Sequence, residues 1–492
     1  MLAVQCLLAR LAFLPPHVRL RSVQKLSVAG SPKAASALLR VLELQDHVVH
    51  STALTGLRTV GPALLKPAME HLRSGVPARQ LAGAEALGVL QSGAASALPT
   101  LLETLSSPVS DVRVHCLETI AILGPHAAKA VEPLTAVLNS PHHREVAASA
   151  TALGRIGTES KAAVPRLMAL VGHVEKDVRD AAADAIGKIG PITRVFIPTL
   201  IEHLTNGDTG VRVAAARALG EMKADAARAV SDLARFVYDP SRDVRQAISE
   251  ALGRIGEAAL QTEPHLQKLL DDKDWGVREA GVRACGQIGM SARETISGVL
   301  QLLNDDRGSV RRAAAQAVGM LGDKAARGAT VLVRLLEDKY QAVQLAAATS
   351  LGQIGPQAAD VVPQIIPLLS STHPHTQDSA IKTLGAIGPS AHDAVPALTS
   401  LMVDPAAGEA AASSLVQMGA SLSEHVPLLA RHLKSDDRNL RLLTIRTLCE
   451  IGKYSETARN SLKECLADSD RTIVEAARQS LEQIQRLTGA SS

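Results

Sequence analysis

Apolar residues recur along this chain in a block that returns about every 33 residues. Clear copies run from Val244 to Gly256 and from Val343 to Gly355, with apolar residues at the first position and again 8 and 11 positions later. We call the first residue of each block the anchor. Positions 0, 4, 8 and 11 after an anchor share one face of an α-helix, so each block predicts an amphipathic helix.

The anchors define an array of two-helix repeats. The nine steps from anchor 79 to anchor 376 are each 33 residues long. The fifteen anchors are residues 18, 49, 79, 112, 145, 178, 211, 244, 277, 310, 343, 376, 407, 440 and 473. Each block is the second helix of its repeat, and a shorter first helix is predicted before it. We therefore expect one continuous solenoid with three segments: residues 1–61 (repeats 1–2), residues 62–391 (the regular repeats 3–12) and residues 392–492 (repeats 13–15).

Three further positions mark the helices of a repeat. Proline stands thirteen residues before many anchors, where the first turn of a helix tolerates it, as at Pro99, Pro165, Pro198, Pro264, Pro363 and Pro427. A row of leucines eleven before the anchor, from Leu7 to Leu266, predicts the buried face of the first helix. Glycine stands twelve after the anchor in twelve of the fifteen repeats and predicts the end of the second helix; the exceptions are Gln91, Lys223 and Gln485.

The residues that fill these helices are unusually small. The 492-residue chain is 46% hydrophobic but has only 1 Trp, 3 Tyr and 3 Phe. The high hydrophobic content excludes a disordered chain. The scarcity of aromatic residues excludes the core of an ordinary globular enzyme. Positions four and seven after the anchor are mostly Ala, Ser, Gly or Thr, which lets neighbouring helices approach closely.

Net charge and cysteine content narrow the class of protein further. A net charge of +3 is too small to indicate a nucleic-acid or membrane partner. The five cysteines have no zinc-type spacing, which favours free thiols in a reducing compartment and a cytoplasmic location. A mitochondrial location is the alternative, because the chain has basic but no acidic residues before Glu43.

The block Val-Arg-x-Ala-Ala-x-x-Ala-Leu-Gly-x-Ile-Gly identifies a repeat family. Residues 178–190 and 277–289 carry it, and it resembles the short HEAT-like repeat first recognised in phycobilisome lyases. Ankyrin repeats share the length, but their Thr-Pro-Leu-His motif is absent. The resemblance covers essentially the whole chain and implies an all-α fold, a right-handed α-solenoid of about fifteen repeats. It also implies that the second helices line a concave surface that binds partners, although fold alone does not specify function.

Arginine follows the anchor in eight repeats, at Arg19, Arg113, Arg179, Arg212, Arg245, Arg278, Arg311 and Arg441. Asp111, Asp177 and Asp243 precede three of these anchors. In HEAT families such Asp and Arg positions form a ladder of hydrogen bonds between successive repeats. A basic stripe that binds phosphate is the alternative. The aspartates beside these arginines weaken the positive field that phosphate binding needs, so we favour the hydrogen-bonded ladder.

Charged residues of both signs are expected on the concave face. Asp184, Arg217, Glu250 and Arg283 stand six after their anchors, and Glu221 and Arg254 stand ten after. They form either a solvated ladder of ion pairs that fixes the register of the helices, which we favour, or a mixed-charge groove for a protein partner. Glu250 and Arg254 are spaced for a pair within one helix. The mixture of signs argues against a nucleic-acid groove.

Trp275 is the exceptional aromatic residue. It stands two before an anchor, where other repeats have Ser110, Lys176, Thr209, Arg242 or Gly308. Tryptophan at an exposed turn is either a hot spot for a partner or a local cover on the hydrophobic layer. Trp275 therefore joins Asp184, Arg217, Glu221, Glu250, Arg254 and Arg283 as a candidate partner-binding residue.

No catalytic, metal or cofactor motif was found. The histidines, including His142-His143, His373 and His375, lack partners at metal-ligand spacing, and no phosphate-binding or nucleophile motif is present. The sequence predicts a non-catalytic scaffold or adaptor for protein partners, without cofactor. The alternative is an accessory subunit of an enzyme, such as a bilin-lyase-like complex. The partner and the oligomeric state stay open.

One joint in the array departs from the pattern. The segment from Val403 to Gly408 shortens a step to 31 residues and precedes the weakest copy of the block. We expect a flexible hinge or a change of curvature there.

Overall fold

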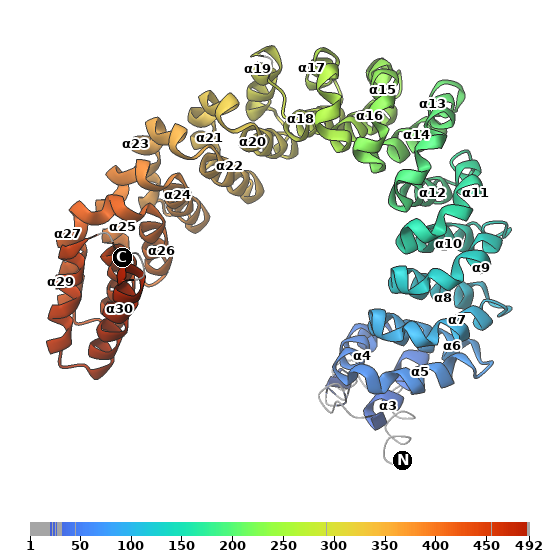
Figure 1. The fold of residues 1–492 in the computed structure, drawn as a ribbon, viewed down its shortest axis with the longest axis horizontal. Coiled ribbons are helices and arrows are strands. Elements are labelled where there is room, and N and C mark those ends of the chain that lie inside the picture. The colour runs from blue at the N-terminus through green and yellow to red at the C-terminus, as the bar shows by residue number, and fades with distance from the viewer. Residues whose placement is uncertain are drawn as a thin grey trace. The chain divides into compact units, whose positions relative to one another are not determined.

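A computed structural model describes residues 20–21, 23–24, 26, 32–44, 46–291, 293–453 and 455–489 of the chain (Figure 1). These residues form α-helices and 3-10 turns and contain no β-strand. The all-α repeat fold expected from the sequence is confirmed. Two compact units are distinguished by their internal contacts, unit 1 (Met1–Ala258) and unit 2 (Ala259–Ser492). The three segments expected from the regularity of the steps stay a prediction.

Unit 1 alternates short first helices with longer second helices. The second helices are α4 (His47–Val60), α6 (Pro77–Val89), α8 (Ser110–Leu123), α10 (His143–Ile156), α12 (Lys176–Ile189), α14 (Thr209–Glu221) and α16 (Arg242–Ile255). The first helices are α3 (Pro32–Glu43), α5 (Leu65–Leu72), α7 (Leu98–Thr104), α9 (Val131–Val137), α11 (Val164–Leu170), α13 (Ile197–Asn206) and α15 (Val230–Arg235). Successive second helices pack on one another and form one layer, and the first helices form the other (Figure 1).

Unit 2 has the same plan. Its second helices are α18 (Trp275–Ile288), α20 (Gly308–Leu321), α22 (Gln341–Ile354), α24 (Pro374–Ile387), α26 (Gly408–Met418), α28 (Arg438–Gly452) and α30 (Arg471–Gly489). Its first helices are α17 (Glu263–Leu270), α19 (Arg293–Gln301), α21 (Ala329–Leu335), α23 (Val362–Ile365), α25 (Val395–Leu401), α27 (Val426–Ala430) and α29 (Glu456–Glu464). A 3-10 turn precedes most first helices, as η8 (Gly256–Thr262) precedes α17.

The register read from the sequence is the register of the structure. Every described second helix begins two residues before its anchor, except α26, which begins one residue after anchor 407. Proline lies in the first turn of α7, α11, α13, α17, α23 and α27, as predicted. The leucine row of the first helices is buried, with Leu38, Leu101, Leu134, Leu167, Leu200, Leu233 and Leu266 each 0% exposed. Leu7 and Arg19 lie outside the described residues.

Small residues bring adjacent second helices into backbone contact. A Cβ on Gly154 would lie 2.7 Å from Cα of Ala185, and a Cβ on Gly220 would lie 2.8 Å from Cα of Ala251. In each pair the glycine stands nine after one anchor and the alanine seven after the next. At that second position Ser350 Oγ reaches across and donates to the carbonyl oxygen of Ala315 at 2.7 Å. The small side chains thus allow both close packing and hydrogen bonds between repeats.

The ends of the second helices follow the glycine pattern closely. Glycines twelve after the anchor adopt positive φ, for example 76° at Gly256. Gln91 and Lys223, two of the three sequence exceptions, keep positive φ at 49° and 51°. Gly452 is different, because it is the last residue of α28 and the helix is capped by Lys453. The third exception, Gln485, lies inside α30.

Candidate partner-binding surfaces

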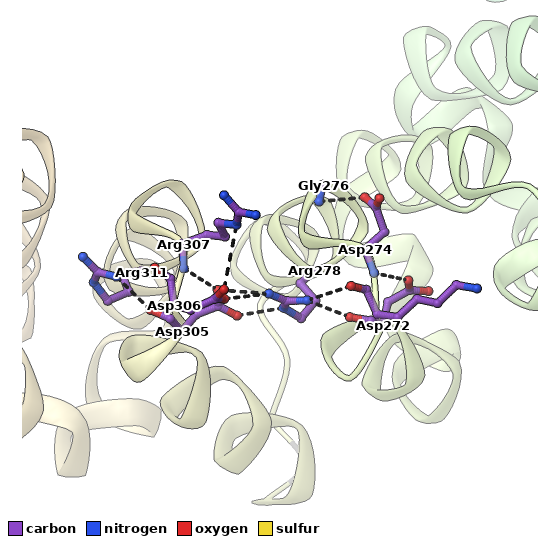
Figure 2. A network of polar contacts seen from close by, with 9 residues as sticks. Asp272, Asp274, Gly276, Arg278, Asp305, Asp306, Arg307 and Arg311 are labelled. Carbon is purple, nitrogen blue, oxygen red and sulfur yellow. Dashed lines mark hydrogen bonds and ion pairs between the residues drawn. The ribbon is translucent and has the colours of Figure 1, made fainter.

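Arginines that follow the anchors link successive repeats of unit 2 (Figure 2). Arg278 Nη1 donates to the carbonyl oxygen of Asp272 at 2.9 Å, and its Nε and Nη2 donate to the Asp305 carboxylate at 2.7 and 3.0 Å. Arg311 repeats this arrangement one repeat later, with the carbonyl of Asp305 at 2.8 Å and the carboxylate of Asp338 at 2.7 and 2.9 Å. Each guanidinium therefore ties the turn of its own repeat to the turn of the next.

The ladder was predicted correctly, but its acceptors were not. The paired aspartate stands five before the next anchor, as when Asp239 Oδ2 lies 3.0 Å from Arg212 Nε. Asp111, which precedes its anchor, pairs instead with Arg144 of the following repeat at 2.8 Å. Asp177 and Asp243 are exposed at the surface. Arg113 uses another acceptor, because its Nη2 donates at 2.6 Å to Oε1 of Glu145, the anchor residue in the first turn of α10.

The ion pairs of the ladder perturb the pKa values of their groups. Burial raises the pKa of Asp338, but hydrogen bonds from Arg311 and from the backbone N–H of Tyr340 hold it below its usual value. Burial also raises the pKa of Asp305, but the hydrogen bonds and the charge of Arg278 lower it below its usual value. Hydrogen bonds to these carboxylates in turn raise the pKa of Arg278 and of Arg311. Arginines engaged in this way have little capacity left for phosphate, which favours the structural role.

The exposed surface of the second helices α8, α10, α12, α14 and α16 carries five of the seven candidate residues; we call it the α8–α16 face. Arg217 Nη1 lies 2.7 Å from Asp180 Oδ1 on α12, and Arg254 Nη1 lies 2.9 Å from Glu221 Oε1 on α14. Both pairs join adjacent repeats, so ion pairs between helices do form here. They are half-exposed, and each contributes only about 0–1 kcal/mol to stability.

Two of the candidate residues pair within their own helix. Lys188 Nζ lies 2.6 Å from Asp184 Oδ2 on α12. The expected pair between Glu250 and Arg254 is wrong: Arg254 turns to the preceding repeat, and Glu250 accepts a hydrogen bond from Gln246 Nε2 at 3.0 Å. The Glu221 carboxylate on the adjacent helix α14 lies within reach of Arg254. The repeat spacing alone did not show that Arg254 would pair with Glu221 rather than with Glu250.

The α8–α16 face is hollowed in two places. The larger hollow encloses about 530 Å³ on α8, α10 and α12, and is lined by Val114, Glu118, Ala121, Ile122, Arg144, Ala147, Ala148, Thr151, Arg155, Asp177 and Ala181. The second encloses about 400 Å³ on α12, α14 and α16, and is lined by Lys176, Arg179, Asp180, Thr209, Gly210, Val213, Arg217, Asp243, Gln246, Ala247 and Glu250. Both hollows use the first two turns of α12, so they adjoin.

The apolar part of this face was not predicted. Ile122 is 42% exposed and lines the larger hollow beside Ala147 and Ala148. Its position, ten after the anchor, is polar in the five repeats that follow, from Arg155 to Gln287. The signal was therefore present in the sequence as an apolar residue at a polar position, but only the fold shows that alanines surround it.

The two remaining candidates lie in unit 2. Arg283 Nη2 lies 2.6 Å from Glu279 Oε1 within α18. Trp275 is the first residue of α18 and is 46% exposed, so it is not a buried cover on the hydrophobic layer. It lines a hollow together with Tyr340, which is 50% exposed and was not singled out from the sequence. Tyr340 stands three before its anchor, so the two aromatics occupy nearly the same place in their repeats.

Potentially reactive groups are held in inert settings. Burial raises the pKa of the Cys116 and Cys285 thiols to about 12, which keeps them protonated and poorly nucleophilic at neutral pH. Within the described ranges no three His, Cys, Asp or Glu side chains are grouped so that they could hold a metal ion. Over the same residues, none of the helices combines the length and apolar composition needed to cross a bilayer.

Comparison with known proteins agrees with the repeat fold. A family model for HEAT repeats matches residues 65–154, 131–206, 197–262, 233–319, 262–339, 328–416 and 404–482. Yeast importin-β (Kap95p) aligns with 98% of this chain and 79% of its own at 13% identity, with a TM-score of 0.64. Kap121p bound to the SUMO protease Ulp1p aligns over 98% and 66% of the two chains at 14% identity, with a TM-score of 0.56. Likeness at this identity shows the fold alone. No curated protein sequence matches the chain.

Proposed function

Because the chain belongs to the HEAT-repeat family, we propose that it is a non-catalytic scaffold whose α8–α16 face binds a protein partner. The observation that carries this proposal is the pair of adjoining hollows on one row of second helices. A site of this kind offers apolar contact at Ile122 and the alanines beside it, and polar contact at its rim. Partner-binding surfaces generally combine an apolar centre with a polar rim in this way.

The charges of the face suit a protein better than a nucleic acid. Arg144 and Arg155 line the larger hollow together with Glu118 and Asp177, so both signs are present. Arg217, Arg254 and their carboxylate partners continue this mixture along α14 and α16. A nucleic-acid groove is basic along its length, because each phosphate it binds is negative. Kap121p, whose fold is similar, is bound to a protein, the SUMO protease Ulp1p, and this supports a protein partner by analogy of fold.

A substitution that fills the larger hollow tests the proposal. Ala148→Trp places a bulky side chain in the hollow, whereas Ala169→Trp places the same side chain on the exposed surface of first helix α11. We expect tagged full-length Ala148→Trp protein to recover its partner from native lysate about tenfold less than wild type does, by quantitative mass spectrometry. Loss of about tenfold in binding corresponds to ~1.4 kcal/mol. Ala169→Trp should recover it normally.

The polar rim is tested separately. Joint charge reversal at Arg217, Glu250 and Arg254 removes the pairing pattern of this face while adding no bulk. If the proteins recovered with this variant and with Ala148→Trp are those recovered with wild type, the α8–α16 face is not the binding surface. The alternative role, as accessory subunit of a bilin-lyase-like complex, predicts pigment absorbance in the protein after co-expression with a partner subunit and pigment.

We also propose a cytoplasmic location. The four described cysteines, Cys116, Cys285, Cys449 and Cys465, are free and buried, as is usual in a reducing compartment. Most of the acid-poor segment that suggested the mitochondrial alternative, including Cys6, lies outside the described residues. Cell fractionation with antibody detection distinguishes the two locations.

A further inference from the structure

Two exposed aromatic side chains in unit 2 line one hollow at the N-terminal ends of three second helices. Trp275 begins α18, Gly308 begins α20, and Tyr340 directly precedes α22. Trp275 and Tyr340 are 46% and 50% exposed, although large aromatics are rare in this chain. The hollow encloses about 380 Å³, and its lining includes Trp275, Arg307, Gly308, Arg312 and Tyr340.

The ring of Tyr340 is fixed in place by its neighbours. A Cβ on Gly308 would lie 2.5 Å from Cδ2 of Tyr340, so the ring packs directly against the glycine backbone. Lys339 Nζ lies 5.1 Å from the ring centre and the Arg311 guanidinium carbon lies 5.9 Å from it, both within range of a cation–π interaction. The ring therefore forms a preformed wall of the hollow.

The turns that carry the hollow are ordered by the arginine ladder (Figure 2). Asp305, which begins the turn before α20, is bound by Arg278, and Asp338, which begins the turn before α22, is bound by Arg311. The side chains of both aspartates are only 6% exposed. These two carboxylates are thus neutralised by the ladder and contribute little negative charge to the surface.

Positive charge remains at the hollow itself. The side chains of Arg307 and Arg312, which line it, are 61% and 41% exposed. Their nearest acids are shared: Glu279 lies 3.8 Å from Arg312 but 2.6 Å from Arg283, and Asp306 lies 3.8 Å from Arg307 but 3.3 Å from Arg278. The N-termini of α20 and α22, which have no side-chain cap, add partial positive charge, whereas the carboxylate of Asp274 caps α18. The hollow therefore combines aromatic walls with an excess of positive charge.

We propose that this hollow binds a short, extended, acidic peptide of a partner protein. One bulky apolar side chain of the peptide lies between Trp275 and Tyr340, and carboxylates on either side of it pair with Arg307 and Arg312. Tryptophan, tyrosine and arginine are the residues that contribute most to binding at protein interfaces. Three stacked helices span ~20 Å at ~8–10 Å per step, which matches about six residues of extended chain.

A nucleic acid fits the hollow less well. Phosphates would recur along the strand and meet Asp306 and Glu279 beside the two arginines, whereas an acidic peptide can place its few carboxylates at the arginines alone. The hollow uses only residues of unit 2, whereas the proposed function rests on the α8–α16 face of unit 1. The two proposals can therefore fail separately.

Trp275 is the only tryptophan of the chain, so its fluorescence reports directly on the hollow. The probe is the synthetic peptide Asp-Glu-Asp-Phe-Asp-Glu-Asp, titrated into the full chain up to about 1 mM, the limit of weak specific binding. We expect a saturable change of emission. The same peptide with Gly in place of Phe, and the peptide Lys-Arg-Lys-Phe-Lys-Arg-Lys, should each bind at least about tenfold more weakly.

Variants of the lining residues are compared by fluorescence anisotropy of the labelled peptide. Arg307→Glu with Arg312→Glu, and separately Tyr340→Ala, should each weaken binding about tenfold, or ~1.4 kcal/mol. Tyr340→Phe keeps the ring and should bind normally. Arg334→Glu changes an exposed arginine on first helix α21 and is the matched charge control. Circular dichroism and the melting temperature establish that each variant is folded.

Several outcomes overturn the proposal. These are no emission change with the acidic Phe peptide, equal binding of the Gly or the basic peptide, and equal weakening by Arg334→Glu. The hollow is assigned to nucleic acid instead if single-stranded oligo(dT) binds more tightly than the peptide and if the Arg307→Glu, Arg312→Glu variant loses this oligo(dT) binding. None of these results bears on capture by the α8–α16 face, which the Ala148→Trp variant measures.

Discussion

At the residue scale, the repeat makes single positions comparable with their equivalents in other repeats. In most of the described repeats the position twelve after the anchor adopts positive φ, and glycine is common there because it has no Cβ to clash with the backbone. Gln91 and Lys223 adopt the same positive φ without being glycine. The glycine pattern was readable from the sequence. That the two exceptions keep the glycine conformation was not, because a helix could also have continued through them, as α30 does through Gln485.

Replacing either exception by glycine should therefore stabilise the protein. A left-handed residue with a side chain costs ~1–2 kcal/mol relative to glycine, so Gln91→Gly and Lys223→Gly are each expected to raise the free energy of unfolding by about 1 kcal/mol. Urea denaturation followed by circular dichroism measures the change. Gly256→Ala, at a position with φ of 76°, is the reverse control and should destabilise. A lower urea midpoint for both glycine variants would contradict the prediction.

At the scale of an element, the links made by Arg278 and Arg311 each depend on one carboxylate in the turn of the next repeat. The lowered pKa of Asp338 means that its ion pair stabilises the fold above about pH 4, the usual carboxyl pKa, and that this stability is lost as the pH falls through the lower pKa of the folded state. Asp305 follows the same rule. The sequence could predict that Arg278 and Arg311 were paired. It could not select the acceptor, because several aspartates lie near each turn.

Asp338→Asn should lower stability in a pH-dependent way. At pH 7 we expect it to cost about 1.5–3 kcal/mol, as for loss of a hydrogen bond to a charged group. The difference from wild type should shrink as the pH falls from about 4, where the carboxylate of the unfolded chain takes up a proton, through the lower pKa of the folded state, below which the folded carboxylate is protonated as well. Urea midpoints at a series of pH values test this. Asp306→Asn, at a side chain 78% exposed, is the control and should change little. A difference that stays constant with pH would refute the ion-pair explanation.

The joint before α26 interrupts the ladder. In the two repeats before the joint, the residue after the anchor is Gln344 or Gln377 instead of arginine. These side chains donate to the carbonyl oxygens of Asp338 and Leu369 at 2.7 and 2.9 Å, respectively. In the repeat of α26 the corresponding residue is Gly408, which has no side chain to form such a link. Helix α26 has 11 residues where α24 has 14. The turn is closed locally instead, by the N–H of Gly408 donating to the carbonyl oxygen of Asp404 at 2.8 Å. The ladder thus makes no charged link across this joint.

We therefore expect the joint to open more readily than its neighbours. Hydrogen exchange should show lower protection for Val403 to Gly408 and the first turn of α26 than for the corresponding turns before α20 and α22. Gly408→Ala tests the packing, because a Cβ there would lie 2.6 Å from the carbonyl oxygen of Met402. That variant should lower protection in α26 further. Uniform protection from α24 to α28 would mean that the joint is not a hinge.

At the scale of the whole molecule, stability is distributed along the array rather than held in one core. Within each unit, a second helix packs mainly on the neighbouring second helices and on the first helix of its own repeat. In such arrays stability is close to a sum of repeat terms and nearest-neighbour terms, so damage stays local. The scarcity of aromatics follows from this arrangement, since each thin layer is filled by leucine, isoleucine, valine and alanine.

A core substitution should accordingly act locally. Leu219→Ala removes a side chain that is 0% exposed in α14 and should cost about 2–5 kcal/mol in that repeat. Hydrogen exchange should rise in α12, α14 and α16 and stay at wild-type values in unit 2. Leu384→Ala in α24, also 0% exposed, is the reciprocal control and should leave unit 1 unchanged. Loss of protection throughout both units would show a single cooperative core instead.

The sequence by itself determined the repeat, the register of its helices, the buried rows and the glycine at the helix ends, because these depend on periodicity within one repeat. The tertiary structure alone decided which partner each charged residue takes, as Arg254 turning to Glu221 shows. It also decided where small residues leave a hollow beside Ile122, and that Trp275 and Tyr340, two repeats apart, line a common site. These features depend on distances between side chains of different repeats, and helical periodicity does not specify them.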